Sequence, residues 1–275
     1  MLAFSGRMTM SINYVVACWS GMRRINPKLY LEDRSVFLRI HLESLQRLKH
    51  SLSQVTFVFA DNPEEPEEYK EFRTALPDRI GSAKVVSIQR PNVGYSYGAY
   101  NDVFDKYRSD FDHYLLMEDD YVYTQDQFDQ ELLRSLEEDP RCGLVSFVCD
   151  KGTREWITGR ARREAPGGRA VADSIDRYLP ETFVFPRIMV GLARSKALDA
   201  IWKEFGRLPF SQGVNHTGCK FEGQFSLAVV FQKLGWTVAD MLPRWRAEAF
   251  GPAGERLMYG PPDRPLFVKP IQFEL

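Results

Sequence analysis

Short apolar runs alternate with amphipathic stretches over the first half of the chain. The runs are rich in β-branched and aromatic residues, which predicts buried strands at 13–19, 55–60, 84–88, 114–117 and 143–148. Between the runs, apolar residues recur at helical spacing and predict helices from Ser35, near 67–76, from Ser96 and over 125–138, with Ser35 and Ser96 as N-caps. Strands that alternate with helices predict an α/β fold with a mostly parallel central sheet flanked by helices.

The second half has a less regular pattern. Residues 151–169 are polar and rich in arginine, which predicts a long loop of the kind that forms lids or binding segments. Ser195 is predicted to cap a helix, and residues 222–234 are apolar almost all round, which predicts a buried helix. From Phe250 the chain is rich in proline and glycine, and we expect it to be extended.

The segment 113–123 (HYLLMEDDYVY) has the strongest chemical signal. The apolar run Tyr114–Met117 leads directly into Glu118, Asp119 and Asp120. Alternate residues of a strand point the same way, so Glu118 and Asp120 are expected to share one side. Clustered carboxylates repel unless a cation neutralises them, and Mg²⁺ and Mn²⁺ prefer carboxylate oxygens. A solvated acidic turn is the alternative.

Composition and charge narrow the class of protein. A chain of 275 residues with 44% hydrophobic content can bury a large core, and we expect one domain over 1–275. A formal net charge of −1 does not favour binding to nucleic acid or to an anionic membrane. No apolar stretch is long enough for a transmembrane segment or a secretory signal. The four cysteines form no CxxC pair, which argues against a zinc site and fits a cytoplasmic protein; peripheral attachment to a membrane stays open.

Other polar features also follow predicted strands. Asp61 ends the second strand, and the loop 90–101 (RPNVGYSYGAYN) follows the third. In parallel sheets ligands bind outside the carboxyl ends of the strands, so these features and the acids are expected at one edge. The loop lacks the GxGxxG fingerprint of dinucleotide binding, and an ordinary strand-to-helix turn is its simplest explanation.

The order of these motifs resembles the GT-A glycosyltransferases, and most closely the family-2-like nucleotide-sugar transferases. The resemblance rests on Asp61 after the second strand, on Asn92-x-Gly94 with a later Asn101, and on an apolar strand that ends in Glu118-x-Asp120. It covers mainly the first half and implies a nucleotide-sugar-binding half over about 9–150. Glu118 stands where the family usually has aspartate.

The resemblance implies roles for individual residues. Asp120, with Glu118 or Asp119, would hold Mn²⁺ or Mg²⁺ on the donor diphosphate, and Asp61 would bind the base. The residues expected along the nucleotide sugar are Ala17, Trp19, Ser20, Asp61, Asn92, Gly94, Asn101 and Asp119.

The half over about 151–275 is expected to bind the acceptor and complete the active site. The family carries an acid before a helix that ends near a Gly-aromatic pair, which here corresponds to Glu222 and Gly235–Trp236. The resemblance therefore implies that Glu222 is the catalytic base; a first-turn glutamate is also commonplace without any such role. His216 is a weaker metal candidate. Trp156 and Trp236 are candidates for stacking on an acceptor sugar, although tryptophans are more often core residues.

These observations and the resemblance predict a metal-dependent glycosyltransferase that moves a sugar from a nucleotide-diphosphate sugar to a hydroxyl of a carbohydrate, glycolipid or glycoprotein. The reaction is expected to invert the anomeric configuration if Glu222 is the base, and a retaining route stays open if it is not. Such an enzyme would serve glycan or polysaccharide synthesis. Two alternatives stay open: a sugar-nucleotide nucleotidyltransferase, and a non-catalytic carbohydrate-binding module.

Overall fold

The computed structural model describes residues 10–21, 35–146, 149–164, 180–186, 190–209, 211–212, 223, 225–240, 258–259 and 267–268. All structural statements below concern these residues. Glu222 and His216 lie outside them.

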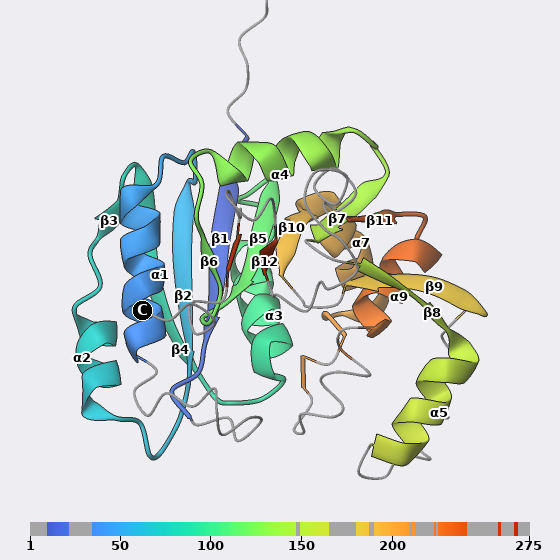
Figure 1. Cartoon of the computed structure of the whole chain (residues 1–275), viewed down its shortest axis with the longest axis horizontal. Helices are drawn as coiled ribbons and strands as arrows, with labels where there is room; N and C mark the ends of the chain where they lie inside the picture. The colour runs from blue at the N-terminus through green and yellow to red at the C-terminus, as the bar shows by residue number, and fades with distance from the viewer. Residues whose placement is uncertain are drawn as a thin grey trace, which may run out of the picture.

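An eight-stranded sheet forms the centre of the molecule, in the order β11-β7-β10-β5-β1-β2-β4-β3 (Figure 1). Its strands are β1 Ile12–Cys18, β2 Gln54–Ala60, β3 Arg79–Ile80, β4 Ala83–Arg90, β5 His113–Glu118, β7 Cys142–Ser146, β10 Gly191–Arg194 and β11 Thr237–Asp240. Strands β5, β1, β2 and β4 are neighbours and run parallel. Strand β10 is antiparallel to both β5 and β7, so the sheet is mixed.

Helices cover both faces of this sheet, as the sequence predicted. One buried cluster joins the sheet to α1 Ser35–Arg47, α2 Glu67–Thr74 and α4 Phe128–Glu137. The opposite cluster joins it to α3 Tyr95–Tyr107, α7 Ser195–Phe205 and α9 Phe225–Lys233. In β1, Tyr14 and Val16 belong to the first cluster and Val15 to the second, because successive side chains of a strand point to opposite faces. The α/β architecture with a mostly parallel core is therefore confirmed.

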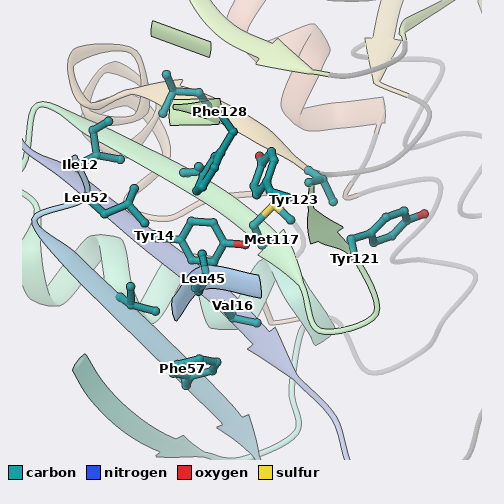
Figure 2. Close-up of a cluster of buried hydrophobic side chains, with 14 of the residues drawn as sticks. Ile12, Tyr14, Val16, Leu45, Leu52, Phe57, Met117, Tyr121, Tyr123 and Phe128 are labelled. Atoms are coloured by element: carbon teal, nitrogen blue, oxygen red, sulfur yellow. The ribbon is translucent and has the colours of Figure 1, made fainter. Parts of the chain in front are cut away.

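Aromatic side chains fill the first cluster (Figure 2). Phe128 of α4 is fully buried and stacks on Tyr123, with ring centroids 3.9 Å apart and planes 11° apart. Tyr14 meets both rings edge-on. Burying one such side chain stabilises the fold by about 1.5–3 kcal/mol. These contacts pack β1, β6 and the start of α4 together, and β6 directly follows the acidic turn.

Two smaller sheets complete the described structure. Strand β6 Val122–Tyr123 pairs with β13 Phe267–Val268, which pairs with β12 Met258–Tyr259. Strands β8 Cys149–Thr153 and β9 Thr182–Pro186 form an antiparallel pair beside the main sheet. Among the helices described, none is long and apolar enough to cross a membrane.

The structure corrects three sequence predictions. Residues 151–169 are not a long loop where they are described: β8 runs to Thr153, and a helix, α5, follows at Arg154–Glu164. Ser96 is not the N-cap of α3, since the helix begins at Tyr95 and Gly94 occupies the cap position. Ser195 is the first residue of α7, and Arg194 is its N-cap.

Candidate active site

The strand order of the sheet reverses between β1 and β5. From β1 the chain proceeds through β2 to β4 on one side, and then returns to place β5 on the other side of β1. In open α/β sheets ligands bind at such a switch point, outside the carboxyl ends of the strands. The residues that end β1 and β5 are Ala17–Ser20 and Glu118–Asp120, and both groups were predicted from the sequence.

The two strand ends are joined through Asp119. Its Oδ2 accepts a hydrogen bond of 3.0 Å from the Trp19 backbone N–H, and its own N–H donates to the Ala17 carbonyl at 3.2 Å. Asp119 is only 4% exposed and Ser20 only 3%. Asp119 therefore holds the β1 and β5 ends in fixed register, and it orders the backbone at the position where the resemblance expects a nucleotide.

Glu118 and Asp120 lie on either side of this buried carboxylate, and both are half-buried. Glu118 Oε1 accepts a hydrogen bond of 2.8 Å from the Ser96 hydroxyl in the first turn of α3. The Tyr121 N–H donates to the Glu118 carbonyl at 3.3 Å and closes the turn. Glu118 is thus drawn toward the positive end of α3, which stabilises its negative charge.

His41 of α1 supports the acidic turn from inside the protein. Its ring is fully buried, and its Nε2 lies 2.7 Å from the Tyr14 hydroxyl. Burial lowers the His41 pKa to about 4, although the Asp119 backbone and the Asp120 carboxylate act to raise it. Burial also keeps the pKa of Tyr14 well above its usual value. Both groups are therefore uncharged at neutral pH and share one buried hydrogen bond.

The loop between β4 and α3 approaches the same edge. Gly94 has φ = +74°, and a Cβ there would lie 2.2 Å from the Ser211 carbonyl oxygen. Only glycine satisfies both conditions, because the left-handed region strains other residues and the space is filled by backbone. Tyr95 also has a positive φ, of 50°. A non-glycine residue in this region costs energy and is often found at a functional site.

Arg90 fixes the loop between β4 and α3 through hydrogen bonds. It is 6% exposed; its Nε donates to Asp102 at 2.6 Å and one terminal nitrogen donates to the Val93 carbonyl at 2.7 Å. Asn92, between these anchors, is exposed and can reach a ligand. The arginine therefore fixes the backbone on either side of the residue that the resemblance assigns to the nucleotide-sugar pocket.

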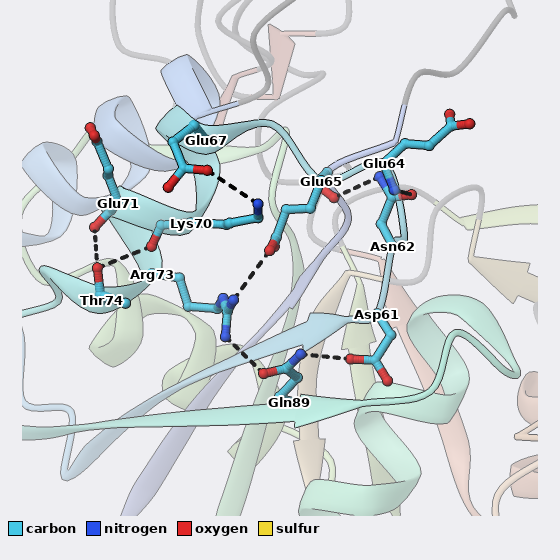
Figure 3. Close-up of polar contacts among 11 residues, drawn as sticks. Asp61, Asn62, Glu64, Glu65, Glu67, Lys70, Glu71, Arg73, Thr74 and Gln89 are labelled. Atoms are coloured by element: carbon cyan, nitrogen blue, oxygen red, sulfur yellow. Dashed lines mark hydrogen bonds and ion pairs between the residues drawn. The ribbon is translucent and has the colours of Figure 1, made fainter.

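The end of β2 contributes a polar network (Figure 3). Gln89 donates to Asp61 at 2.8 Å and accepts from Arg73 at 2.7 Å. Arg73 in turn pairs with Glu65 at 3.1 Å. Asp61 is exposed at the surface, and its N–H donates to the Arg90 carbonyl at 2.7 Å. The base-binding role of Asp61 stays a prediction, with a side chain positioned by Gln89.

Asn62 links this network to the segment after β1, since its amide donates to the Ser20 hydroxyl at 3.0 Å. Asn101 has a different setting from the other predicted residues. It is buried, and its Oδ1 accepts from the Leu208 N–H at 3.0 Å, so its side chain ties α3 to the segment after α7.

The two candidate acceptor tryptophans lie in different surroundings. Trp236 is partly buried and packs against the second cluster, beside Gly143. Trp156 is 44% exposed on α5, stacks on Phe185 with centroids 6.1 Å apart, and has the Arg160 guanidinium 5.8 Å from its ring centroid. The proposed catalytic Glu222 and the weaker metal candidate His216 fall on residues outside the described ranges.

The metal prediction depends on the acidic turn. Within the described ranges, no three His, Cys, Asp or Glu side chains are grouped so that they could hold a metal ion by themselves. Mg²⁺ characteristically binds through one or two carboxylates together with substrate phosphates. The half-buried oxygens of Glu118 and Asp120 fit this second arrangement, in which the substrate completes the coordination.

Sequence reasoning missed several residues that position this site. Ser96 was assigned to a helix cap, and His41, Arg90 and Asn62 were given no role. Their contacts join segments far apart in the sequence, such as His41 with Asp119. The arginine that directly precedes the Asn92–Gly94 loop was the signal in the sequence that could have indicated an anchor.

No protein-family model matches this chain, and no curated protein matches it. Solved structures similar to it include a CMP:2-keto-3-deoxy-manno-octonic acid synthetase complexed with CTP, at a TM-score of 0.46 and 11% identity, over 84% of this chain and 89% of the other. They also include a glucosyl-3-phosphoglycerate synthase from Mycobacterium tuberculosis in complex with Mn²⁺, UDP and glucosyl-3-phosphoglycerate, at a TM-score of 0.43 and 14% identity, over 87% of this chain and 75% of the other. The same synthase in complex with phosphoglyceric acid gives a TM-score of 0.45 at 15% identity.

Proposed function

We propose that this protein is a glycosyltransferase that uses a nucleotide-diphosphate sugar and a divalent cation. One observation carries the proposal: the acidic turn Glu118–Asp120 closes β5 at the switch point of the sheet, hydrogen-bonded to both β1 and the first turn of α3. Three consecutive acidic residues at the carboxyl edge of the parallel strands favour a nearby positive charge. The exposed Asn92 and Asp61 stand at the ends of β4 and β2, along the same edge.

The donor would lie across the carboxyl ends of β1, β2 and β5. Asp120 and Glu118 would hold Mn²⁺ or Mg²⁺, which when bound offsets the negative charge that develops on the departing diphosphate. Asp119 keeps the Trp19–Ser20 backbone in place beside the nucleotide, and Gly94 allows the loop to approach closely. Asp61, held by Gln89, would accept a hydrogen bond from the base.

The transfer step requires a base near the acceptor. An acceptor hydroxyl attacks the anomeric carbon, the new C–O bond forms as the bond to the diphosphate breaks, and the nucleoside diphosphate leaves. We propose Glu222 as the carboxylate that takes the hydroxyl proton, on the basis of its position in the sequence before α9. A single displacement of this kind inverts the anomeric configuration. The acceptor can be a carbohydrate, glycolipid or glycoprotein hydroxyl.

The test is turnover of UDP-, GDP- and dTDP-sugars with Mn²⁺ present and after chelation. Asp120→Asn should lower turnover by at least about 100-fold, as removal of a group that stabilises developing charge does. Asp105→Asn, at an exposed position further along α3, is the matched control and should retain activity. Equal activity of wild type with and without the cation would contradict the metal role.

The products separate the proposal from its alternatives. Release of a nucleoside diphosphate with a new glycosidic bond supports the transferase. Release of pyrophosphate from a nucleoside triphosphate and a free sugar would identify a nucleotidyltransferase at the same site. Glycan binding with neither product would leave a carbohydrate-binding module.

A further inference from the structure

We infer that the outer face of α5 is a docking surface for an anionic lipid membrane. The sequence indicated a polar loop here, and the observed helix changes how its side chains are arranged. Residues four and seven positions apart share one face of a helix, so Trp156, Arg160 and Arg163 form one stripe. We call these three residues the outer stripe.

The helix presents the outer stripe to solvent because its opposite face is buried. Ile157 is 0% exposed and Thr158 6%. The Trp156 ring packs on Phe185 of β9 and is still 44% exposed. Trp156 and Arg163 are exposed, and Arg160 is half-buried beside the Trp156 ring. Figure 1 shows α5 projecting from the β8–β9 pair, away from the main sheet. The stripe therefore lies on a protruding part of the molecule, where a flat surface can reach it.

The charge of α5 complements an anionic surface. The helix contains four arginines and two glutamates, a net charge of 4 − 2 = +2, whereas the whole chain has −1. Basic side chains near an anionic membrane contribute about 1 kcal/mol each, and tryptophan favours the interface between lipid and water. Small molecules bind mostly in concave sites. A convex helix with an exposed tryptophan and two arginines on one face fits an extended anionic surface better.

The Trp156 environment is suited to this role. Phe185 stacks beside the ring and Arg160 lies near it, so the indole has a defined orientation although it is 44% exposed. Preorganisation of this kind lowers the entropy lost on binding. The proposal does not depend on the catalytic assignment, because it concerns binding alone.

The test measures sedimentation of the full chain with vesicles of phosphatidylcholine, with and without phosphatidylglycerol. Binding should require phosphatidylglycerol and should weaken as salt rises, because the Debye length falls from about 10 Å at 0.1 M to about 3 Å at 1 M. Replacing both Arg160 and Arg163 by Gln should weaken vesicle binding about 25-fold, or about fivefold for each arginine.

Arg163→Glu keeps the test decisive if the double variant fails to fold, since Arg163 is exposed and its replacement leaves the buried face unchanged. It should weaken binding about 25-fold by reversing one charge. Arg141→Gln is the matched control, at a side chain 76% exposed outside α5, and should bind like wild type. Equal binding to neutral vesicles, or no effect of Arg163→Glu, would overturn the inference. Pelleting of the protein without vesicles would do the same, because it would indicate self-association.

Discussion

Acidification should destabilise the folded protein through the buried imidazole of His41. The pKa of this ring is about 4 in the folded protein and 6.5 in an unfolded chain. Between these values the unfolded state binds more protons, so the free energy of unfolding falls as pH falls. The contribution of His41 to the free energy of unfolding is fully present above pH 6.5. About 2 kcal/mol of this contribution is lost by about pH 5, and about 3 kcal/mol is lost once the pH is below 4, at 1.36 kcal/mol per pKa unit.

Urea unfolding at about pH 7.5 and pH 5 measures this loss directly. In His41→Gln the free energy of unfolding should fall by about 2 kcal/mol less over this interval than in wild type, whatever the variant's stability at neutral pH. His113→Gln offers a matched comparison of the same size, because burial and Arg194 also lower the His113 pKa to about 4, against the opposing effect of Asp112. Parallel pH curves for wild type and His41→Gln would refute the reasoning, since they would mean that His41 titrates alike in both states.

Two further predictions concern the loop between β4 and α3. Gly94→Ala should lower the free energy of unfolding by more than the about 1–2 kcal/mol that a left-handed residue costs, because its Cβ would lie 2.2 Å from the Ser211 carbonyl oxygen, and it should weaken nucleotide-sugar binding. Gly206→Ala is the control in the same unfolding assay: its φ is +69° and no atom lies within 4 Å of the new Cβ, so it should show the backbone cost alone. Equal losses of stability in the two variants would argue against a clash between residue 94 and Ser211. Arg90→Gln should cost about 1–3 kcal/mol of stability by removing the charge-assisted hydrogen bonds of a buried guanidinium. A double-mutant cycle with Asp102→Asn checks this, and strict additivity would show that the 2.6 Å ion pair contributes nothing.

The parallel core of the sheet could be predicted because its signal is local. Strands β1, β2 and β5 are short apolar runs buried on both faces, and β4 is a partly exposed run with three β-branched residues; such runs contrast with the amphipathic helices between them. The position of the acids at the end of β5 then follows from the chain itself. The carboxyl-edge arrangement of Ala17–Ser20, Asp61 and the Asn92–Gly94 loop follows from the rule for parallel sheets.

The second half could not be predicted as well because its signals are weak or non-local. Strand β10 has only four residues, and its place between β5 and β7 comes from pairing with strands far away in the sequence. Helix α5 has too few apolar residues to show a helical period. Its start does have a signal, because the Thr153 hydroxyl accepts from the Trp156 N–H at 3.2 Å as an N-cap side chain does.

The candidate site also has a part that could be predicted from the sequence and a part that could not. Its carboxylates were found as a motif, whereas their supports are hydrogen bonds between separate elements. Ser96 illustrates the difference: serine at a helix start is usually a cap, but here the left-handed Gly94 takes that position and the hydroxyl turns to Glu118. Only the packing of α3 against β5 decides between the two arrangements.

The pairing of β6 with β13 affects when the segment after the acidic turn can fold during synthesis. Tyr123 pairs with Phe267, which is added to the growing chain 267 − 123 = 144 residues later. At about 5–20 residues per second the ribosome needs roughly 7–30 s to cover that interval. The segment directly after Asp120 therefore emerges without its strand partner, and β6 can pair only after Phe267 and Val268 have been added to the chain.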